Sequence, residues 1–253
     1  MIKINVYGGT DRGKVRANNQ DSICFNQFNK PSQLLAIVAD GVGGHAGGDV
    51  ASKLAVNVIE EHFRKAVMLA NSGAGYSDNW CLQNIDKAIQ LANQEIKQQQ
   101  GEDERLASMA TTVVMLVAID DTAGFSYLGD SRLYGWRDNC LNQLSKDHTV
   151  AQQMIDDGVL TDDQASMSPY HHVLTRGLGI KGDIDIVTYN LNLQSRDIYL
   201  LCSDGLTNCL SDDAIEQILA SDMDIKLKVD ELIAAANDNG GHDNISVVLV
   251  ECE

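Results

Sequence analysis

The order of apolar and polar residues divides the chain into strand-like and helix-like stretches. Short apolar runs predict strands, and apolar residues three or four positions apart predict helices. The predicted strands are 2–8, 22–28, 34–39, 111–119, 124–128, 132–136, 141–144, 184–191, 197–202 and 244–251. The predicted helices are about 47–68 and 81–99 (with a loop at 71–79 between them), 149–157, a short one starting at 161–164, and those near 212–220 and 224–237.

The predicted strands come in runs separated by pairs of helices, without strict alternation. That order favours antiparallel sheets with helices packed outside them over β-α-β units. The chain has 253 residues, enough for one large domain or two small ones. We find no repeat or linker and only two prolines, so we expect one domain, 1–253, with two sheets.

Two of the predicted strands end on an aspartate that is followed by a glycine. The segment LLAIVADGVGG (residues 34–44) stops on Asp40, and IYLLCSDGL (residues 198–206) stops on Asp204. A carboxylate at the end of a buried strand is costly unless a partner compensates its desolvation. Two strands of this kind indicate a shared partner.

Three further aspartates, Asp21, Asp130 and Asp243, also lie at strand ends among small or turn-forming residues. Each alone could simply order its turn through backbone hydrogen bonds. Together, the five aspartates favour an oxygen-rich site for a hard cation such as Mg²⁺ or Mn²⁺. Gly41 has no side chain, so its carbonyl could approach such a cation closely.

Composition limits the partners and the compartment. The chain has 19 basic and 36 acidic residues, a formal charge of −17 that argues against nucleic acid and anionic membranes as partners. The N-terminus lacks an apolar signal segment, and no apolar run nears the roughly 18 residues of a membrane helix. A cytoplasmic location is therefore expected. The scattered cysteines form no CxxC pair, which favours reduced thiols and disfavours zinc: Cys24, Cys81, Cys140, Cys202, Cys209 and Cys252.

Eight segments, taken in order, resemble the motifs of the metal-dependent protein phosphatase (PPM) family, the type 2C serine/threonine phosphatases. The compact bacterial form is the most similar. A single Asp-Gly pair is a weak signal, but eight motifs in the right order, over roughly residues 6–250, are highly specific. The segments are RANNQD, VADGVGGHAGG, MATTVVMLV, YLGDSRLY, KDHT, VLTRGLG, LLCSDGLTN and GHDNISVVLV.

The resemblance implies the fold and the core ligands. The fold class is α+β, a four-layer αββα sandwich in which helix pairs flank two antiparallel sheets and a two-metal centre lies at one end. Asp40 would bridge both ions, and Asp204 and Asp243 would hold one of them. The Gly41 carbonyl would reach the other ion, with Asp21 beside them, directly or through water.

The resemblance also implies a third, weaker ion, held by Asp130 together with Asp204. Arg16 would grip the substrate phosphate, since its fork of donors matches a phosphate edge; the simpler reading is a surface ion pair. Paired cations lower the pKa of a bridging water and supply a hydroxide for in-line attack on phosphorus. The catalytic residues would be Arg16, Asp40 and Asp204.

The predicted protein is thus a cytoplasmic, Mn²⁺- or Mg²⁺-dependent serine/threonine protein phosphatase. Its partners would be phosphorylated proteins, the substrates of a cognate kinase, and we expect a monomer that binds neither nucleic acid nor membrane. Two alternatives remain: a catalytically silent binding or regulatory protein with the same fold, and a haloacid dehalogenase-type hydrolase. The latter needs a DxDx[TV] motif, which ADGVG and SDGLT lack.

The chain departs from the animal PPM pattern at the expected general acid. Animal members carry a histidine directly after the Asp-Gly pair, where this chain has Val42. His45, three residues later, and His148 in KDHT are candidates for proton transfer. A structural hydrogen bond explains either histidine as well.

A second departure lies in residues 149–175, which correspond to the family's flap beside the site. His171 and His172 stand where arginine and asparagine are usual. They could contact metal or phosphate weakly, although exposed loop histidines are the simpler interpretation.

Overall fold

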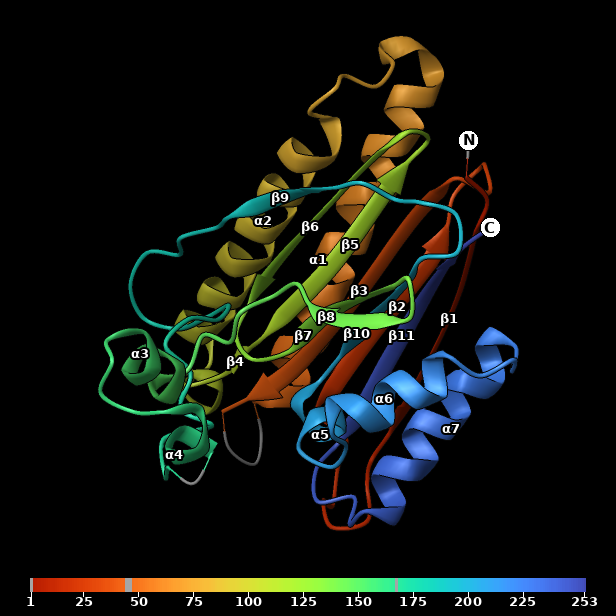
Figure 1. Ribbon diagram of the computed structural model, residues 1–253. Helices are drawn as coiled ribbons and strands as arrows, with labels where there is room; N and C mark the ends of the chain where they lie inside the picture. The colour runs from red at the N-terminus through yellow and green to blue at the C-terminus, as the bar shows by residue number, and fades with distance from the viewer. Residues whose placement is uncertain (1, 44–46, 167) are drawn as a thin grey trace.

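The computed structural model describes residues 2–43, 47–166 and 168–253, and its strands form two antiparallel sheets (Figure 1). The first sheet has the order β1 (Ile4–Asp11), β11 (Ile245–Cys252), β10 (Ile198–Cys202), β7 (Arg132–Arg137) and β8 (Cys140–Gln143). The second has the order β2 (Asp21–Gln27), β3 (Gln33–Val42), β5 (Val113–Ile119), β6 (Thr122–Leu128) and β9 (Thr188–Leu191), and the short β4 (Ala110–Thr111) pairs with β3.

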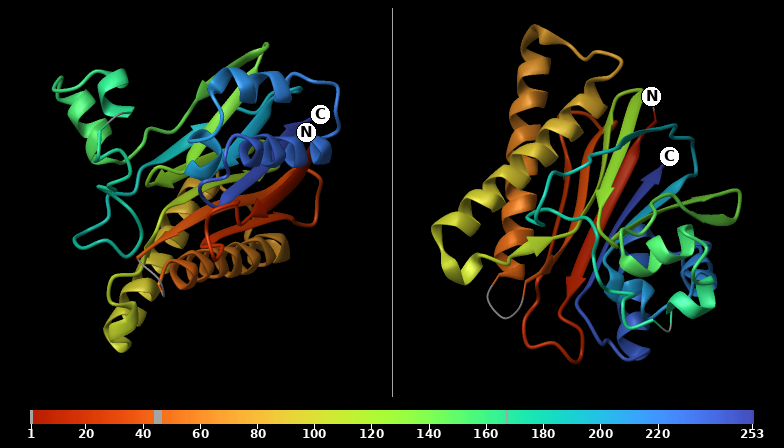
Figure 2. Two further views of the ribbon diagram at one scale, coloured as in Figure 1. Left: turned by 90° about the horizontal axis from the view of Figure 1, so that it is seen from below. Right: turned by 90° about the vertical axis from the view of Figure 1, so that its left-hand side faces the viewer.

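Helices cover the outer face of each sheet. The long helices α1 (Gly48–Leu69) and α2 (Trp80–Glu102) pack on the second sheet, and α5 (Asp204–Thr207), α6 (Asp212–Leu219) and α7 (Ile225–Asp238) pack on the first. Figure 2 shows the resulting order of helices, sheet, sheet and helices, which confirms the predicted αββα sandwich. The short helices α3 (Val150–Asp156) and α4 (Asp162–Ser166) stand beside the layers (Figure 1). None of the described helices is long and apolar enough to cross a membrane.

Burial on both faces explains why the central strands are apolar throughout. In β10, Tyr199 and Leu201 point between the sheets, whereas Ile198, Leu200 and Cys202 point toward the outer helices. The strand alternates between two apolar environments, so period-two polarity disappears from its sequence. β3 follows the same rule, and both strands therefore run through the core before they reach Asp40 and Asp204.

Most predicted elements are present, with local differences. The predicted strand at 111–119 is interrupted at Thr112, which separates β4 from β5. The strand expected at 184–191 is confined to 188–191, and the expected loop at 71–79 begins with a π-helical turn, Ala70–Ala74. The sequence pattern does not predict α5 or the 3₁₀ turn Glu104–Leu106, because elements of three or four residues are too short to show a periodicity.

Replacing Leu201 by alanine tests the packing between the sheets. Leu201 is fully buried, so Leu201→Ala should lower the free energy of unfolding by about 2–5 kcal/mol. Leu227→Ala is the matched control: its side chain is half exposed, and we expect a change within about 0.5 kcal/mol. Urea denaturation measures both, and equal losses in the two variants would contradict this assignment of the core.

Candidate metal centre

The predicted aspartates converge at one end of the sandwich. Asp21, the first residue of β2, lies opposite Asp40 near the end of β3. Asp204 follows β10 and Asp243 precedes β11, and those two strands are antiparallel neighbours. Asp130 follows β6 and is close enough to raise the pKa of Asp40. Both sheets thus deliver carboxylates to one place.

Burial and mutual repulsion disfavour the charged form of these carboxylates. Burial, then the charges of the other aspartates, raises the pKa of Asp40 well above its usual value of 3.8. Burial raises the pKa of Asp21 to about 7, and burial with the charge of Asp204 raises the pKa of Asp130 to about 8. The pKa of Asp204 is also raised, by burial and then by Asp243. Clustered carboxylates of this kind need protons or cations.

The donor set fits divalent cations. Among the described residues, Asp21 Oδ1 and Asp204 Oδ1 are buried without any hydrogen-bond partner. Buried polar atoms are rarely left unsatisfied in a native protein, so an unmatched carboxylate oxygen is a natural metal ligand. The backbone at Gly41 is also tightly enclosed, because a Cβ there would lie 2.0 Å from the Gly48 carbonyl oxygen. That close approach alone requires a glycine, whatever its carbonyl binds.

Two threonine hydroxyl groups fix the backbone of Asp40, a role that was not predicted for them. The Thr112 hydroxyl accepts a hydrogen bond from the Asp40 N–H (2.9 Å), and the Thr111 hydroxyl donates one to the Asp40 carbonyl (2.8 Å). Ser131, next to Asp130, hydrogen-bonds to the Thr112 hydroxyl at 2.7 Å. The interruption between β4 and β5 therefore positions a site residue. The only sequence signal was the quoted motif MATTVVMLV.

A serine hydroxyl positions the carboxylate of Asp21. The hydroxyl of Ser203, the residue before Asp204, donates to Asp21 Oδ2 at 2.7 Å and accepts from the Ser246 N–H at 2.9 Å. The bond connects the end of β10 with the start of β2, which belong to different sheets. It satisfies one oxygen of Asp21 and leaves the other for a cation.

Arg16 lies at the rim of the site, on the loop between β1 and β2. Its Nη2 is 2.6 Å from Asp243 Oδ2, and its side chain is about half exposed. The buried Asn244 secures this loop: its amide donates to the carbonyls of Arg12 (2.8 Å) and Asn18 (2.9 Å) and accepts from the Gln20 N–H (2.8 Å). Asn244 is thus a positioning residue that was not predicted, although it lies in the motif GHDNISVVLV.

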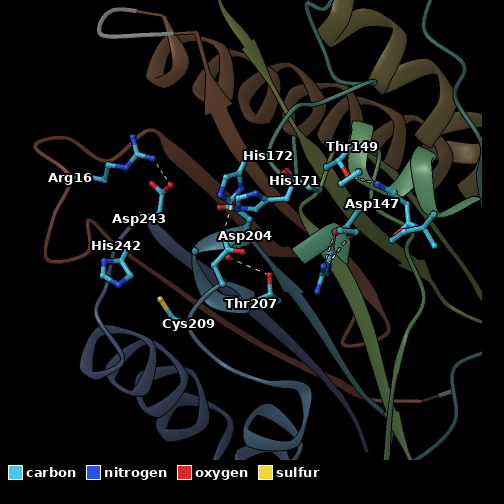
Figure 3. Close-up of a pocket in the computed structure, with 18 residues that line it drawn as sticks. Arg16, Asp147, Thr149, His171, His172, Asp204, Thr207, Cys209, His242 and Asp243 are labelled. Atoms are coloured by element: carbon cyan, nitrogen blue, oxygen red, sulfur yellow. Dashed lines mark hydrogen bonds and ion pairs between the residues drawn. The ribbon is translucent and has the colours of Figure 1, made fainter. Parts of the chain in front are cut away.

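Two adjoining cavities of about 750 and 560 Å³ open over the carboxylates. Figure 3 shows the larger one, with Arg16 directed at Asp243 and the flap histidines beside Asp204. The Asp40 and Gly41 side of the site borders the smaller cavity. The residues that border both are Arg16, Asp130, His172, Asp204 and Asp243.

The two candidate general acids have different outcomes. His45 lies outside the described residues. His148 stacks on Tyr127, with ring centroids 5.1 Å apart, and its Nδ1 accepts a hydrogen bond from the Gly129 N–H at 3.3 Å. Burial and the charge of Arg176 lower the pKa of His148 to about 4, so it is neutral near pH 7. It also borders neither cavity, and this geometry supports the structural role.

The site and fold agree with comparisons to known proteins. The family Protein phosphatase 2C matches residues 8–246 of the chain. The chain belongs to the protein phosphatase 2C family. A serine/threonine phosphatase named stp from Listeria monocytogenes is 36% identical over 242 residues, which cover 96% of this chain and 93% of that protein. This family membership confirms the predicted resemblance and the protein phosphatase class.

Two solved structures of the family resemble this one throughout. The Mycobacterium tuberculosis serine/threonine phosphatase PstP/Ppp superimposes with a TM-score of 0.85 at 30% identity, covering 99% of each chain. The catalytic domain of the phosphatase PstP in complex with two manganese ions has a TM-score of 0.83 at 31% identity, covering 100% of this chain and 99% of that one. The shared phosphatase fold argues against the haloacid dehalogenase alternative.

The raised pKa values predict how pH affects the stability of the metal-free protein. Asp21, near 7, and Asp130, near 8, hold protons in the folded state that the unfolded chain releases at about pH 4. The folded state therefore binds more protons, and its stability should fall as pH rises from about 6.5 to about 8. Burial lowers the pKa of His148 and of His62, which gives an opposing contribution that fades as unfolded histidine loses its proton above about pH 6.5.

Thermal unfolding in chelator across this pH range, repeated with Mn²⁺, measures the effect. We expect Mn²⁺ to reverse the loss, because a cation neutralises the carboxylates that would otherwise repel. The double variant Asp21→Asn, Asp130→Asn should flatten the dependence. A metal-free protein whose stability rises over this pH range would contradict the assignment.

Proposed function

We propose that the chain is a serine/threonine protein phosphatase that hydrolyses phosphoserine and phosphothreonine in proteins. The observation that carries this proposal is the convergence of five strand-end aspartates, two of them with unmatched buried oxygens, below a cavity rimmed by Arg16. The listerial relative is named for the same activity. A silent binding protein would have no need to keep these mutually repelling carboxylates together.

The core of the proposed centre is a pair of Mn²⁺ or Mg²⁺ ions. Asp40 would bridge them, Asp204 and Asp243 would hold one, and the Gly41 carbonyl would reach the other, with Asp21 beside them. The PstP catalytic domain, which has the same fold, is in complex with two manganese ions, and this supports a pair of ions here. When bound, such cations activate water as a nucleophile and neutralise charge on the phosphoryl group. Asp130, with Asp204, would hold a third and weaker ion.

Arg16 supplies the protein's own contact with the substrate. Its guanidinium lies 2.6 Å from Asp243 and faces the cavity, so a phosphate above the carboxylates is within its reach (Figure 3). A forked, permanently charged donor can bind two phosphoryl oxygens at once and fix the phosphorus for in-line attack. The exposure of Arg16 and His172 leaves the site open to a side chain of another protein.

The remaining parts of the proposal concern the chain as a whole. We treat residues 1–253 as one phosphatase domain with a flap at about 149–175. Its partners would be phosphorylated proteins in the cytoplasm, made by a cognate kinase, and it would act as a monomer. The net charge of −17 supports proteins over nucleic acid or anionic membranes as partners.

Replacing Asp40 tests the metal centre. Asp40→Asn removes a charged bridging ligand, so release of phosphate from a phosphothreonine peptide with Mn²⁺ should be abolished, and chelation should abolish it reversibly. The same variant should unfold at a higher temperature than the unaltered protein in chelator, because one repelling carboxylate is gone. Asp238→Asn, at an exposed ion pair, is the control and should retain turnover. Near-normal turnover of Asp40→Asn in chelator would refute the mechanism.

Arg16 should behave as a substrate-binding residue. Arg16→Ala should raise KM and lower kcat, because the arginine contacts phosphate in both the ground and the transition state. Arg16→Lys should restore part of the loss, since lysine offers a charge without a fork. Arg105→Ala is the matched control: its guanidinium pairs with Asp103, also at 2.6 Å, away from both cavities. Steady-state kinetics on a phosphopeptide measure all three, and unchanged Arg16→Ala kinetics would leave Arg16 a surface ion pair.

A further inference from the structure

His172 lies within reach of two carboxylates of the site. One imidazole nitrogen of His172 and one carboxylate oxygen each from Asp130 and Asp204 lie within 4.8 Å of one another. Its Nδ1 is 3.6 Å from Asp204 Oδ2, too far for a hydrogen bond. Ligands on opposite sides of a cation with bonds of about 2.1 Å lie about 4.2 Å apart, so small side-chain rotations would close the cluster around an ion.

The backbone holds His172 in this place. The next residue, Val173, accepts a hydrogen bond from the Val150 N–H at 2.8 Å, and Leu174 forms a bridge with Thr149. The two chain segments at the base of the flap are thus paired on the C-terminal side of His172. Its ring is carried by a braced segment of backbone and not by the outer part of the flap.

The same base of the flap is fastened to the turn that carries Asp130. The His148 N–H donates to the Gly129 carbonyl at 2.9 Å, and the Gly129 N–H donates to His148 Nδ1 at 3.3 Å. The His148 carbonyl accepts from the Thr175 N–H at 2.8 Å. His148 therefore joins the Asp130 turn to both ends of the flap, which sets the spacing between Asp130 and His172.

The neighbouring histidine is engaged elsewhere. His171 Nδ1 lies 2.5 Å from the Ser168 carbonyl, which can only accept, so this nitrogen carries the proton and donates. The rings of the two histidines are in contact, with centroids 3.6 Å apart, and both lie beside Asp204 in Figure 3. The pair therefore offers a matched comparison of two adjacent imidazoles.

We infer that His172 is a nitrogen ligand of the third cation site, completing the set begun by Asp130 and Asp204. This inference rests on the metal centre of the proposed function. Transition-metal ions accept an imidazole ligand, with affinity rising from Mn²⁺ to Fe²⁺ and beyond, whereas Mg²⁺ prefers oxygen ligands. The third site of this chain therefore discriminates against Mg²⁺, whereas the oxygen-only core does not. Cation binding there also holds the base of the flap against the core ligands.

Mn²⁺ binding and spectroscopy of the full chain test this inference. Every protein ligand proposed for the core pair is oxygen, so ¹⁴N modulation in the electron spin echo of bound Mn²⁺ reports the third site. We expect that modulation in the unaltered protein and in His171→Gln, and its loss in His172→Gln.

Calorimetric titration measures the affinity of the same site. His172→Gln should lower the Mn²⁺ affinity of the weakest site by about 10- to 100-fold or more, as ligand-shell changes do, while its Mg²⁺ affinity changes less. Asp130→Ala should lower the affinity of that site for Mn²⁺ and for Mg²⁺ alike, because it removes an oxygen ligand.

The outcomes separate this inference from the proposed function. At saturating Mn²⁺, a third bound ion without nitrogen modulation, or the absence of any third ion, would overturn the role of His172 and leave the core pair standing. Modulation that persists in His172→Gln but vanishes in His171→Gln would identify His171 as the ligand and would also overturn the inference. An unaltered protein that binds no Mn²⁺ would overturn both proposals.

Discussion

Repulsion among buried carboxylates is the constraint on which the site end of this molecule depends. Asp40 and its neighbours are packed so closely that burial and mutual charge push their pKa values upward. Without a cation, such a cluster would only lower the free energy of unfolding. Divalent cations reverse the sign of the interaction, because the oxygens that repel one another then share a positive partner. The same feature that weakens the metal-free protein thus makes the site able to bind metal.

The sandwich supplies the rigidity that this arrangement needs. The apolar strands β3 and β10 are buried on both faces, so their ends cannot drift apart when the carboxylates repel. Hydrogen bonds from hydroxyl groups position the site further: Ser203 connects Asp21 to the other sheet, and Thr112 fixes the backbone of Asp40. The strong core therefore holds a locally unfavourable cluster in a geometry ready for cations.

Two polar residues position the loops at the edge of the carboxylate cluster. Asn244 binds the loop that carries Arg16 to the edge of the carboxylate cluster. His148, whose lowered pKa leaves it neutral, binds the flap to the Asp130 turn on the opposite side. Both residues act through backbone contacts and touch no reacting atom. The positions of the Arg16 loop and of the Asp130 turn therefore depend on polar residues outside the carboxylate cluster.

The sequence alone determined the element pattern, because apolar periodicity reports burial directly. It also singled out the five aspartates, because a carboxylate at the end of a buried strand is costly without a partner. It could not determine their spacing, since Asp21 and Asp243 are far apart in the chain and meet only when both sheets form. For the same reason the sequence did not single out Asn244 or Ser203: most of their partners lie in distant parts of the chain. His172 is the clearest case. In the sequence it is a loop histidine, and only the hydrogen bonds at the base of the flap, which no local pattern encodes, bring it to Asp130 and Asp204.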